Sequence, residues 1–167
     1  MSTYIVRNSA MATTAAPTKV TTGTAIKTLL QLAPSSGNPI VVKEWGISFD
    51  GSAAATPIAV ELVDTYAVAA TVTAFVANDV QPYLRLSDVG ASSVTLGTAA
   101  SGYTASAEGT ITQTRHGDLQ LVAPSSQYVK QMPLGMEFFV PGGHFLRIRV
   151  TAPTAVNAWC YVIYQDM

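Results

Sequence analysis

Three separate stretches of the chain alternate large apolar residues with small or polar ones, and this period of two constrains the fold more than any other feature. The stretches are 45–49, 58–62 and 146–150. Successive side chains of a β-strand point to opposite faces, so each stretch is predicted to be a half-buried strand. No long stretch carries a convincing helical period. The pattern therefore predicts an all-β protein.

Further strands and the turns between them follow from local composition. Strands are predicted at 26–32, 41–49 and 136–140, with a weaker one at 72–76. Turns rich in Pro, Gly, Asn and Ser are predicted at 34–39, 50–51 and 141–143. Many short strands with such turns indicate a sandwich or barrel, and we predict a β-sandwich of jelly-roll type over residues 25–167. Residues 87–110, rich in Ser, Ala, Gly and Thr, are predicted to be a long connection or a set of short strands.

The final strand, predicted over 156–164, is apolar on both faces. One face carries Val156, Ala158, Cys160 and Val162, and the other carries Trp159, Tyr161 and Ile163. A strand that is apolar on both faces is usually covered on both sides. We expect the first face to lie in the core. The second face, with Trp159, Tyr161 and Ile163, is a candidate interface with another subunit.

The beginning of the chain is poor in large apolar residues. Residues 8–25 consist mainly of Ala and Thr, with Pro17 and Gly23. We predict that residues 1–24 form an extended N-terminal arm outside the sandwich domain. Tyr4, Ile5 and Val6 would lie at its tip and anchor the arm in a groove of a neighbouring subunit.

Composition limits the partners and the compartment. Only 11% of the 167 residues are charged, against about 25% in typical domains, which suggests that copies of the chain or a partner cover part of the surface. The formal net charge is −1 without a basic run, so we expect no nucleic-acid partner. No apolar run approaches the roughly 20 residues of a membrane span, and no secretory signal pattern is present, so synthesis in the cytoplasm without a membrane partner is expected. The single cysteine, Cys160, is predicted to be a small core residue.

The residues that usually carry catalysis are scattered. His116 and His144 are distant in sequence and are predicted to lie in exposed turns, where they would not form a metal site. Arg115 to Asp118 is predicted to be a polar turn. Cys160 is expected to be buried, which argues against a nucleophile, and no motif for a phosphate loop or a serine nucleophile occurs. We expect a protein that is not an enzyme and holds no metal or cofactor.

Two arginines lie on the polar face of the strand at 146–150. Arg147 and Arg149 are expected to be solvated or to pair with acids on a neighbouring strand, such as Glu61. The alternative is that they dock onto an acidic partner, and for that reason they join the candidate interface residues.

The C-terminal third resembles a class of viral structural proteins. The run from Pro141 to Pro153, followed by Val156-Asn157 and the strand from Trp159 to Gln165, looks like small head proteins of tailed bacteriophages, namely capsid decoration or cement proteins. The stretch from Trp45 to Gly51 and the Pro-Ile-x-Val-Glu-Leu strand after it fit the same resemblance. It implies a β-sandwich that forms a homotrimer, binds across neighbouring major capsid proteins and resides on the capsid surface of the virion.

Three other functions compete with this one. A receptor-binding or tail-fibre head module, the first alternative, would cluster aromatic or acidic residues in apical loops. A self-assembling coat protein that packages RNA would carry a basic arm, whereas the predicted arm holds only Arg7 and Lys19. A cupin-like enzyme would need metal ligands that are missing from the sequence.

Overall fold

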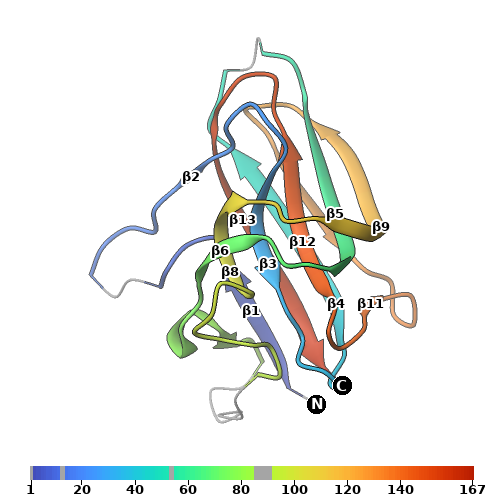
Figure 1. Cartoon of the computed structure of the whole chain (residues 1–167). Coiled ribbons are helices and arrows are strands. Elements are labelled where there is room, and N and C mark those ends of the chain that lie inside the picture. Colours follow the sequence, from blue (N-terminus) through green and yellow to red (C-terminus); the bar gives the residue numbers. More distant parts are fainter. Residues whose placement is uncertain (1, 12–13, 53–54, 85–91) are drawn as a thin grey trace.

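The chain folds into two antiparallel β-sheets that pack face to face, as the computed structural model in Figure 1 shows. The structure describes residues 2–11, 14–52, 55–84 and 92–167. Within these residues the only helical element is a short 3-10 turn, η1 (Ala77–Asp79), and no helix is long and apolar enough to cross a membrane. The predicted all-β sandwich is confirmed, while its jelly-roll topology stays a prediction.

The first sheet, sheet A, has the last strand of the chain at its centre. The order along its main path is β10-β4-β13-β1-β7, with β11 also paired to β4 and β2 also paired to β13. Its strands are β1 (Thr3–Arg7), β2 (Val20–Thr21), β4 (Ile40–Phe49), β7 (Gln81–Pro82), β10 (Gln127–Gln131), β11 (Phe138–Val140) and β13 (Asn157–Asp166).

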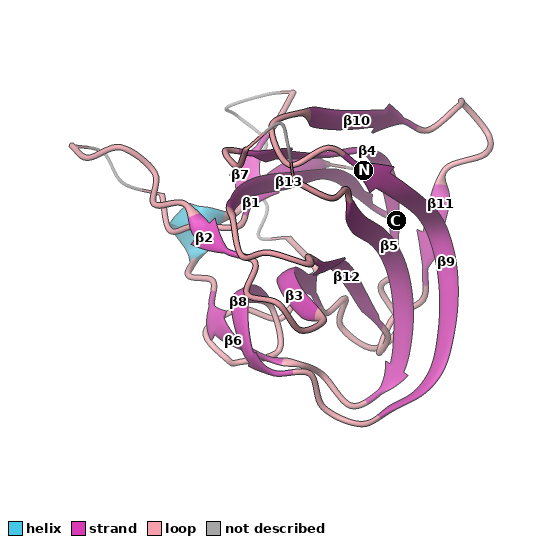
Figure 2. Ribbon diagram, turned by 90° about the horizontal axis from the view of Figure 1, so that it is seen from above, coloured by secondary structure: helices cyan, strands magenta, loops and turns pink. Residues whose placement is uncertain are grey.

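The second sheet, sheet B, has the order β6-β8-β3-β12-β5-β9. Its strands are β3 (Lys27–Leu32), β5 (Ile58–Ala67), β6 (Thr71–Ala74), β8 (Gly102–Ala107), β9 (Ile111–Val122) and β12 (Phe145–Thr151). Figure 2 shows the two layers, with β5 and β9 curving around one side of the sandwich. The order places β12, one of the three alternating stretches, at the centre of its sheet.

The core fills the space between the sheets and follows the alternation in the sequence. Trp45, Ile47 and Phe49 of β4 point inward, as do Ile58, Val60 and Leu62 of β5 and Leu146, Ile148 and Val150 of β12. Cys160 is buried among them, which confirms its prediction as a core residue, and burial raises the pKa of its thiol. Removing these apolar faces from water is the main force that holds the two sheets together.

The prediction of an extended arm over residues 1–24 is wrong at its beginning. Thr3–Arg7 form β1, which pairs with β13 and with β7 inside sheet A. Tyr4 and Val6 lie in the protein's own core, so they cannot anchor an arm in a neighbouring subunit. The described part of the following segment, up to β2, does lack strand and projects from the sandwich (Figure 1).

The strands β9 and β10 were not predicted from the sequence. The predicted polar turn from Arg115 to Asp118 is part of β9, and a register irregularity falls there, between the partners Leu62 and Val63 of β5. His116 therefore lies in a strand and not in a turn, which corrects its prediction. Both strands are edges of their sheets. Edge strands carry polar and charged side chains more often than central ones, which obscures their alternation.

Asp118 joins these two edge strands across the gap between the sheets. Its carboxylate accepts hydrogen bonds from Tyr128 Oη at 2.8 Å and Gln120 Nε2 at 3.1 Å, and it pairs with Lys130 Nζ at 3.3 Å. Burial opposes ionisation, but the bonds from Gln120, Tyr128 and Lys130 outweigh it and lower the pKa of Asp118. Burial and the neighbouring carboxylate raise the pKa of Tyr128 to about 12. The ionised Asp118 is therefore the form that the fold favours.

We expect Asp118→Asn to lower the free energy of unfolding at neutral pH by about 1–3 kcal/mol, because charged hydrogen bonds contribute that much. Since the folded pKa lies below the ordinary value of 3.8, this contribution is complete above pH 3.8 and is lost as the pH falls through the folded pKa. Urea denaturation at neutral and acidic pH measures both effects. Equal acid sensitivity of the variant and the wild type would contradict this role.

Candidate functional site: the outer face of sheet A

Strand register brings polar and aromatic side chains together on the outer face of sheet A. Trp159 of β13 lies opposite Ser48 of β4, which lies opposite Gln127 of β10. A second row lies two residues away along each strand. It consists of Arg7 of β1, Tyr161 of β13, Gly46 of β4 and Val129 of β10. Because alternate residues face the same side, the two rows are neighbours on a surface that points away from the core.

Tyr161 lies flat over Gly46. A Cβ atom at position 46 would come within 2.5 Å of the Tyr161 ring, so the close approach requires glycine there. The Tyr161 hydroxyl donates to Glu44, which also accepts from Gln131 Nε2 at 2.8 Å. Burial and the bond to Glu44 raise the pKa of Tyr161. The ring is therefore held in a fixed position as one wall of a depression.

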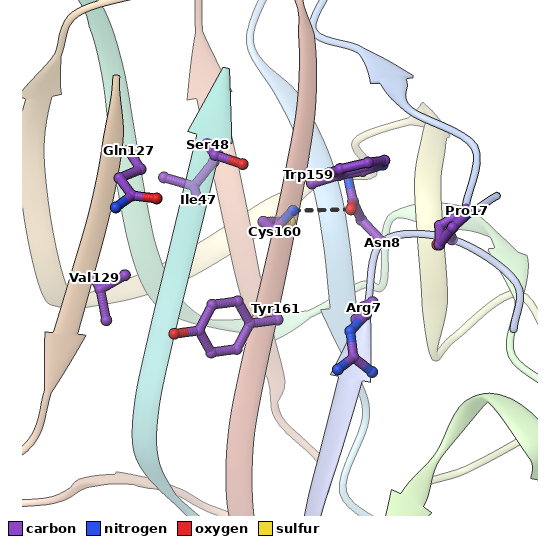
Figure 3. Close-up of a pocket in the computed structure, with 11 residues that line it drawn as sticks. Arg7, Asn8, Pro17, Ile47, Ser48, Gln127, Val129, Trp159, Cys160 and Tyr161 are labelled. Atoms are coloured by element: carbon purple, nitrogen blue, oxygen red, sulfur yellow. Dashed lines mark hydrogen bonds between the residues drawn. The ribbon is translucent and has the colours of Figure 1, made fainter. Parts of the chain in front are cut away.

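The depression is a trough of about 320 Å³ that runs across the strands between the two rows (Figure 3). Trp159 and Tyr161 project from β13 at different levels, with Gln127 and Val129 on the β10 side and Arg7 and Pro17 on the other. Its lining residues are Arg7, Asn8, Ser9, Pro17, Ile47, Ser48, Gln127, Val129, Trp159, Cys160 and Tyr161. A concave, largely apolar site with a few converging polar groups is the usual form of a binding site.

Asn8 fixes the end of the trough where β1 stops. Its Oδ1 accepts from the backbone N–H of Cys160 at 2.9 Å, and its Nδ2 donates to the Ala158 carbonyl at 3.2 Å. The side chain thus continues the hydrogen bonding of β1 to β13 beyond the last residue of the strand. This bonding holds the beginning of the projecting segment beside Trp159 (Figure 3).

The candidate interface residues of the final strand differ in exposure. Trp159 is 43% exposed, and Tyr161 is half-buried on the same face. Ile163 is only 5% exposed, and its neighbour Ile5 on β1 is 8% exposed, so both contribute little free surface. The structure therefore places Trp159 and Tyr161 in the trough and leaves out the other candidates of the first and last strands.

Arg147 and Arg149 do not form a docking surface for an acidic partner. They lie on the opposite side of the molecule, on the outer face of sheet B, and both are buried. Arg149 pairs with Glu61 at 3.0 Å, which confirms the cross-strand pairing expected from the sequence. Both guanidinium groups are therefore bonded to loop carbonyls or carboxylates of the chain itself.

Arg147 binds two loops of the chain at once. It donates to the carbonyls of Val68 at 2.6 Å and Glu108 at 2.8 Å and faces the Glu108 carboxylate at 3.5 Å. Burial lowers its pKa to about 10, so the guanidinium remains charged at neutral pH. These contacts fix the β5–β6 and β8–β9 connections over the outer face of sheet B.

The histidines lie apart from each other, each beside a carboxylate. His144 Nδ1 is 3.0 Å from Asp64, whose other oxygen accepts from Arg115, in a second cavity of about 310 Å³. His116 Nε2 is 3.1 Å from Glu61. Among the residues that the structure describes, no group of three or more His, Cys, Asp or Glu could hold a metal ion. The absence of a metal and of catalysis stays a prediction.

The fold and the site define an antiparallel two-sheet β-sandwich with an aromatic-walled trough on one outer face. No family model matches the chain, and neither a curated protein nor a solved structure matches it. The function is therefore argued from the site itself.

Proposed function

We propose that the chain is a structural protein of a bacteriophage virion that decorates the capsid and stabilises it by binding across neighbouring capsid subunits. This is the function that the resemblance of the C-terminal third implies. In this proposal the protein resides on the capsid surface and contacts the major capsid protein through the outer face of sheet A.

The trough carries the proposal. It presents Trp159 and Tyr161 on the outer face of a sheet, in a protein in which only 11% of residues are charged. The β10–β11 turn at the adjacent edge adds Leu134, which is 94% exposed, and Met136. Aromatic residues, Met and Arg are the types enriched in the buried parts of protein interfaces.

The position of the aromatic residues favours a shell protein over a receptor-binding module. A receptor-binding module would present them in apical loops, whereas Trp159 and Tyr161 belong to β13 in the middle of sheet A. A rigid sheet face suits a partner that offers an extended, regular surface. The neighbouring subunits of a shell offer such a surface.

We expect Trp159→Asp to weaken binding to purified shells that lack this protein by more than about 30-fold, since a central interface aromatic contributes 2 kcal/mol or more. Co-sedimentation of protein and shells measures the effect. Ile26→Asp is the matched control, because Ile26 is 46% exposed and lies outside the trough. Failure of the wild type to bind shells, or equal binding by Trp159→Asp, would overturn the proposal.

Assembly into a homotrimer is part of the same proposal and concerns a different surface. Leu119 and Leu121 of β9 are 57% and 75% exposed on the outer side of sheet B, away from the trough. Sedimentation equilibrium of the free protein measures the mass. A mass of three chains supports this assembly, and a monomer at high concentration contradicts it.

A further inference from the structure

Arg7 stands out among the charged residues because it has no partner in the described structure. It is the last residue of β1, half-buried, and its side chain lines the trough beside Tyr161 (Figure 3). Of the described Lys and Arg side chains, only Arg7 and Lys27 lack an acidic partner, and Lys27 donates to the carbonyl of Thr21. A guanidinium offers five donors in a planar fork that fits a carboxylate.

Among its described residues, a second copy of the chain has no Asp or Glu side chain without a partner to offer Arg7. Every described acidic side chain already accepts hydrogen bonds or ion pairs within its own chain. These are Glu44, Asp50, Glu61, Asp64, Asp79, Glu108, Asp118, Glu137 and Asp166. As far as the described residues go, a carboxylate of a different protein is therefore the better partner for Arg7.

Two other polar side chains of the trough are also unused. Neither the Ser48 hydroxyl nor the Gln127 amide makes a side-chain hydrogen bond within the described chain, although both line the trough. Between these polar groups lie the apolar surfaces of Trp159, Val129 and Pro17. The trough thus combines hydrogen-bonding groups, one cation and an aromatic wall.

The dimensions of the trough fit a short extended peptide. It spans β10, β4, β13 and β1, which are successive neighbours in sheet A. Adjacent strands lie about 4.8 Å apart, so the trough is roughly 14 Å long. An extended chain rises about 3.3 Å per residue, which corresponds to about four residues across the trough.

We propose that the trough binds an extended peptide segment of another protein, with an acidic residue placed on Arg7 and an apolar residue packed between Trp159 and Tyr161. The source of the segment rests on the proposed function, in which it belongs to the major capsid protein. Ser48 and Gln127 then bind polar groups of the segment. Binding weakens as salt increases, because the contact to Arg7 is an ion pair at a partly solvated site.

Selection from a displayed library of random eight-residue peptides tests the occupant directly. We expect peptides selected by the wild-type protein to be enriched in Asp or Glu next to an apolar residue. Titration of a selected peptide is followed by tryptophan fluorescence. Trp159 reports on the trough because it is 43% exposed, whereas Trp45 is fully buried.

Arg7→Gln is expected to lower the affinity for the selected peptide by about 10- to 100-fold. This is the range for loss of a charged hydrogen-bonded contact. Lys27→Gln is the matched control, because it removes the other cation without an acidic partner, outside the trough, and should change the affinity by less than about twofold. Replacing the peptide's acidic residue by its amide should reproduce the loss on the wild type and add little on Arg7→Gln.

The inference is overturned if the selected peptides are not enriched in acids, if no peptide is selected, or if Arg7→Gln and the wild type bind the peptide with equal affinity. Binding of sialic or uronic acid glycans on an array, without peptide binding, would also contradict the inference, because the ligand would then be a sugar and not a peptide.

The shell assay separates this inference from the proposed function. If shells bind the wild type and Arg7→Gln equally, the inference fails and the proposed function stands. If acidic peptides bind but shells do not, the proposed function fails and the specificity of the trough stands.

Discussion

Replacing Trp45 by alanine is expected to lower the free energy of unfolding by about 3–5 kcal/mol, the usual effect of removing a large buried aromatic side chain. Trp45 is fully buried between the sheets, and its ring centroid lies 5.4 Å from that of Tyr128. The substitution leaves a cavity between the two sheets and removes the ring contact between Trp45 and Tyr128. Urea denaturation followed by circular dichroism measures the change.

Two further substitutions serve as controls for Trp45. Trp159→Ala should change the free energy of unfolding by less than about 1 kcal/mol, because Trp159 is 43% exposed on the outer face. Trp45→Phe should be milder than alanine, since the indole N–H of Trp45 is buried without an acceptor in the described structure. If Trp159→Ala destabilised the fold as much as Trp45→Ala, Trp159 would be a packing residue and the trough would lose its role.

Arg147→Ala is the second substitution with a large expected effect, a loss of about 3–5 kcal/mol in the free energy of unfolding. Removal of the guanidinium leaves the carbonyls of Val68 and Glu108 without their donor and the Glu108 carboxylate without its cation. Arg147 is fully buried, so little water can replace these bonds. The β5–β6 and β8–β9 connections should then become more accessible to proteases.

Arg149→Ala is the comparison for Arg147. Its partner Glu61 is also contacted by His116 and remains partly exposed, so a loss of about 1 kcal/mol is expected. Limited proteolysis together with urea denaturation distinguishes the two arginines. Similar, small losses for both would show that Arg147 does not hold the connections in place.

Local alternation was sufficient to predict the central strands. The patterns at 45–49, 58–62 and 146–150 lie in β4, β5 and β12, each of which has neighbours on both sides of its sheet. A central strand in a two-sheet sandwich has one face in the core, and that face imposes the period of two on the sequence. The prediction of a core position for Cys160 is confirmed for the same reason.

The edge strands and the first strand could not be predicted in this way. In β10 the alternation is inverted, because Lys130 turns toward Asp118 while Val129 faces the trough. In β9 the charged residues Arg115 and His116 form pairs with β5 that a local pattern does not reveal. β1 becomes a strand by pairing with β13 and β7, which lie far from it in the sequence.

The same limit applies to the candidate site. Trp159 and Tyr161 were found because a strand that is apolar on both faces needs a second cover. Arg7, Ser48 and Gln127 were missed because only the register of β1 and β4 against β13, and of β10 against β4, brings them beside these rings. A single cation in a segment predicted to be an arm gives no signal of its own.

The pairing of β1 with β13 has a consequence for the order in which the chain folds during translation. The ribosome releases Thr3–Arg7 long before their main partner, Asn157–Asp166, has been synthesised. β13 also separates β1 from β4, so sheet A cannot close before β13 has emerged from the ribosome. Until then the edges of β1 and β4 that bind β13 remain unpaired and open to chaperones, and the trough forms only once β13 is in place.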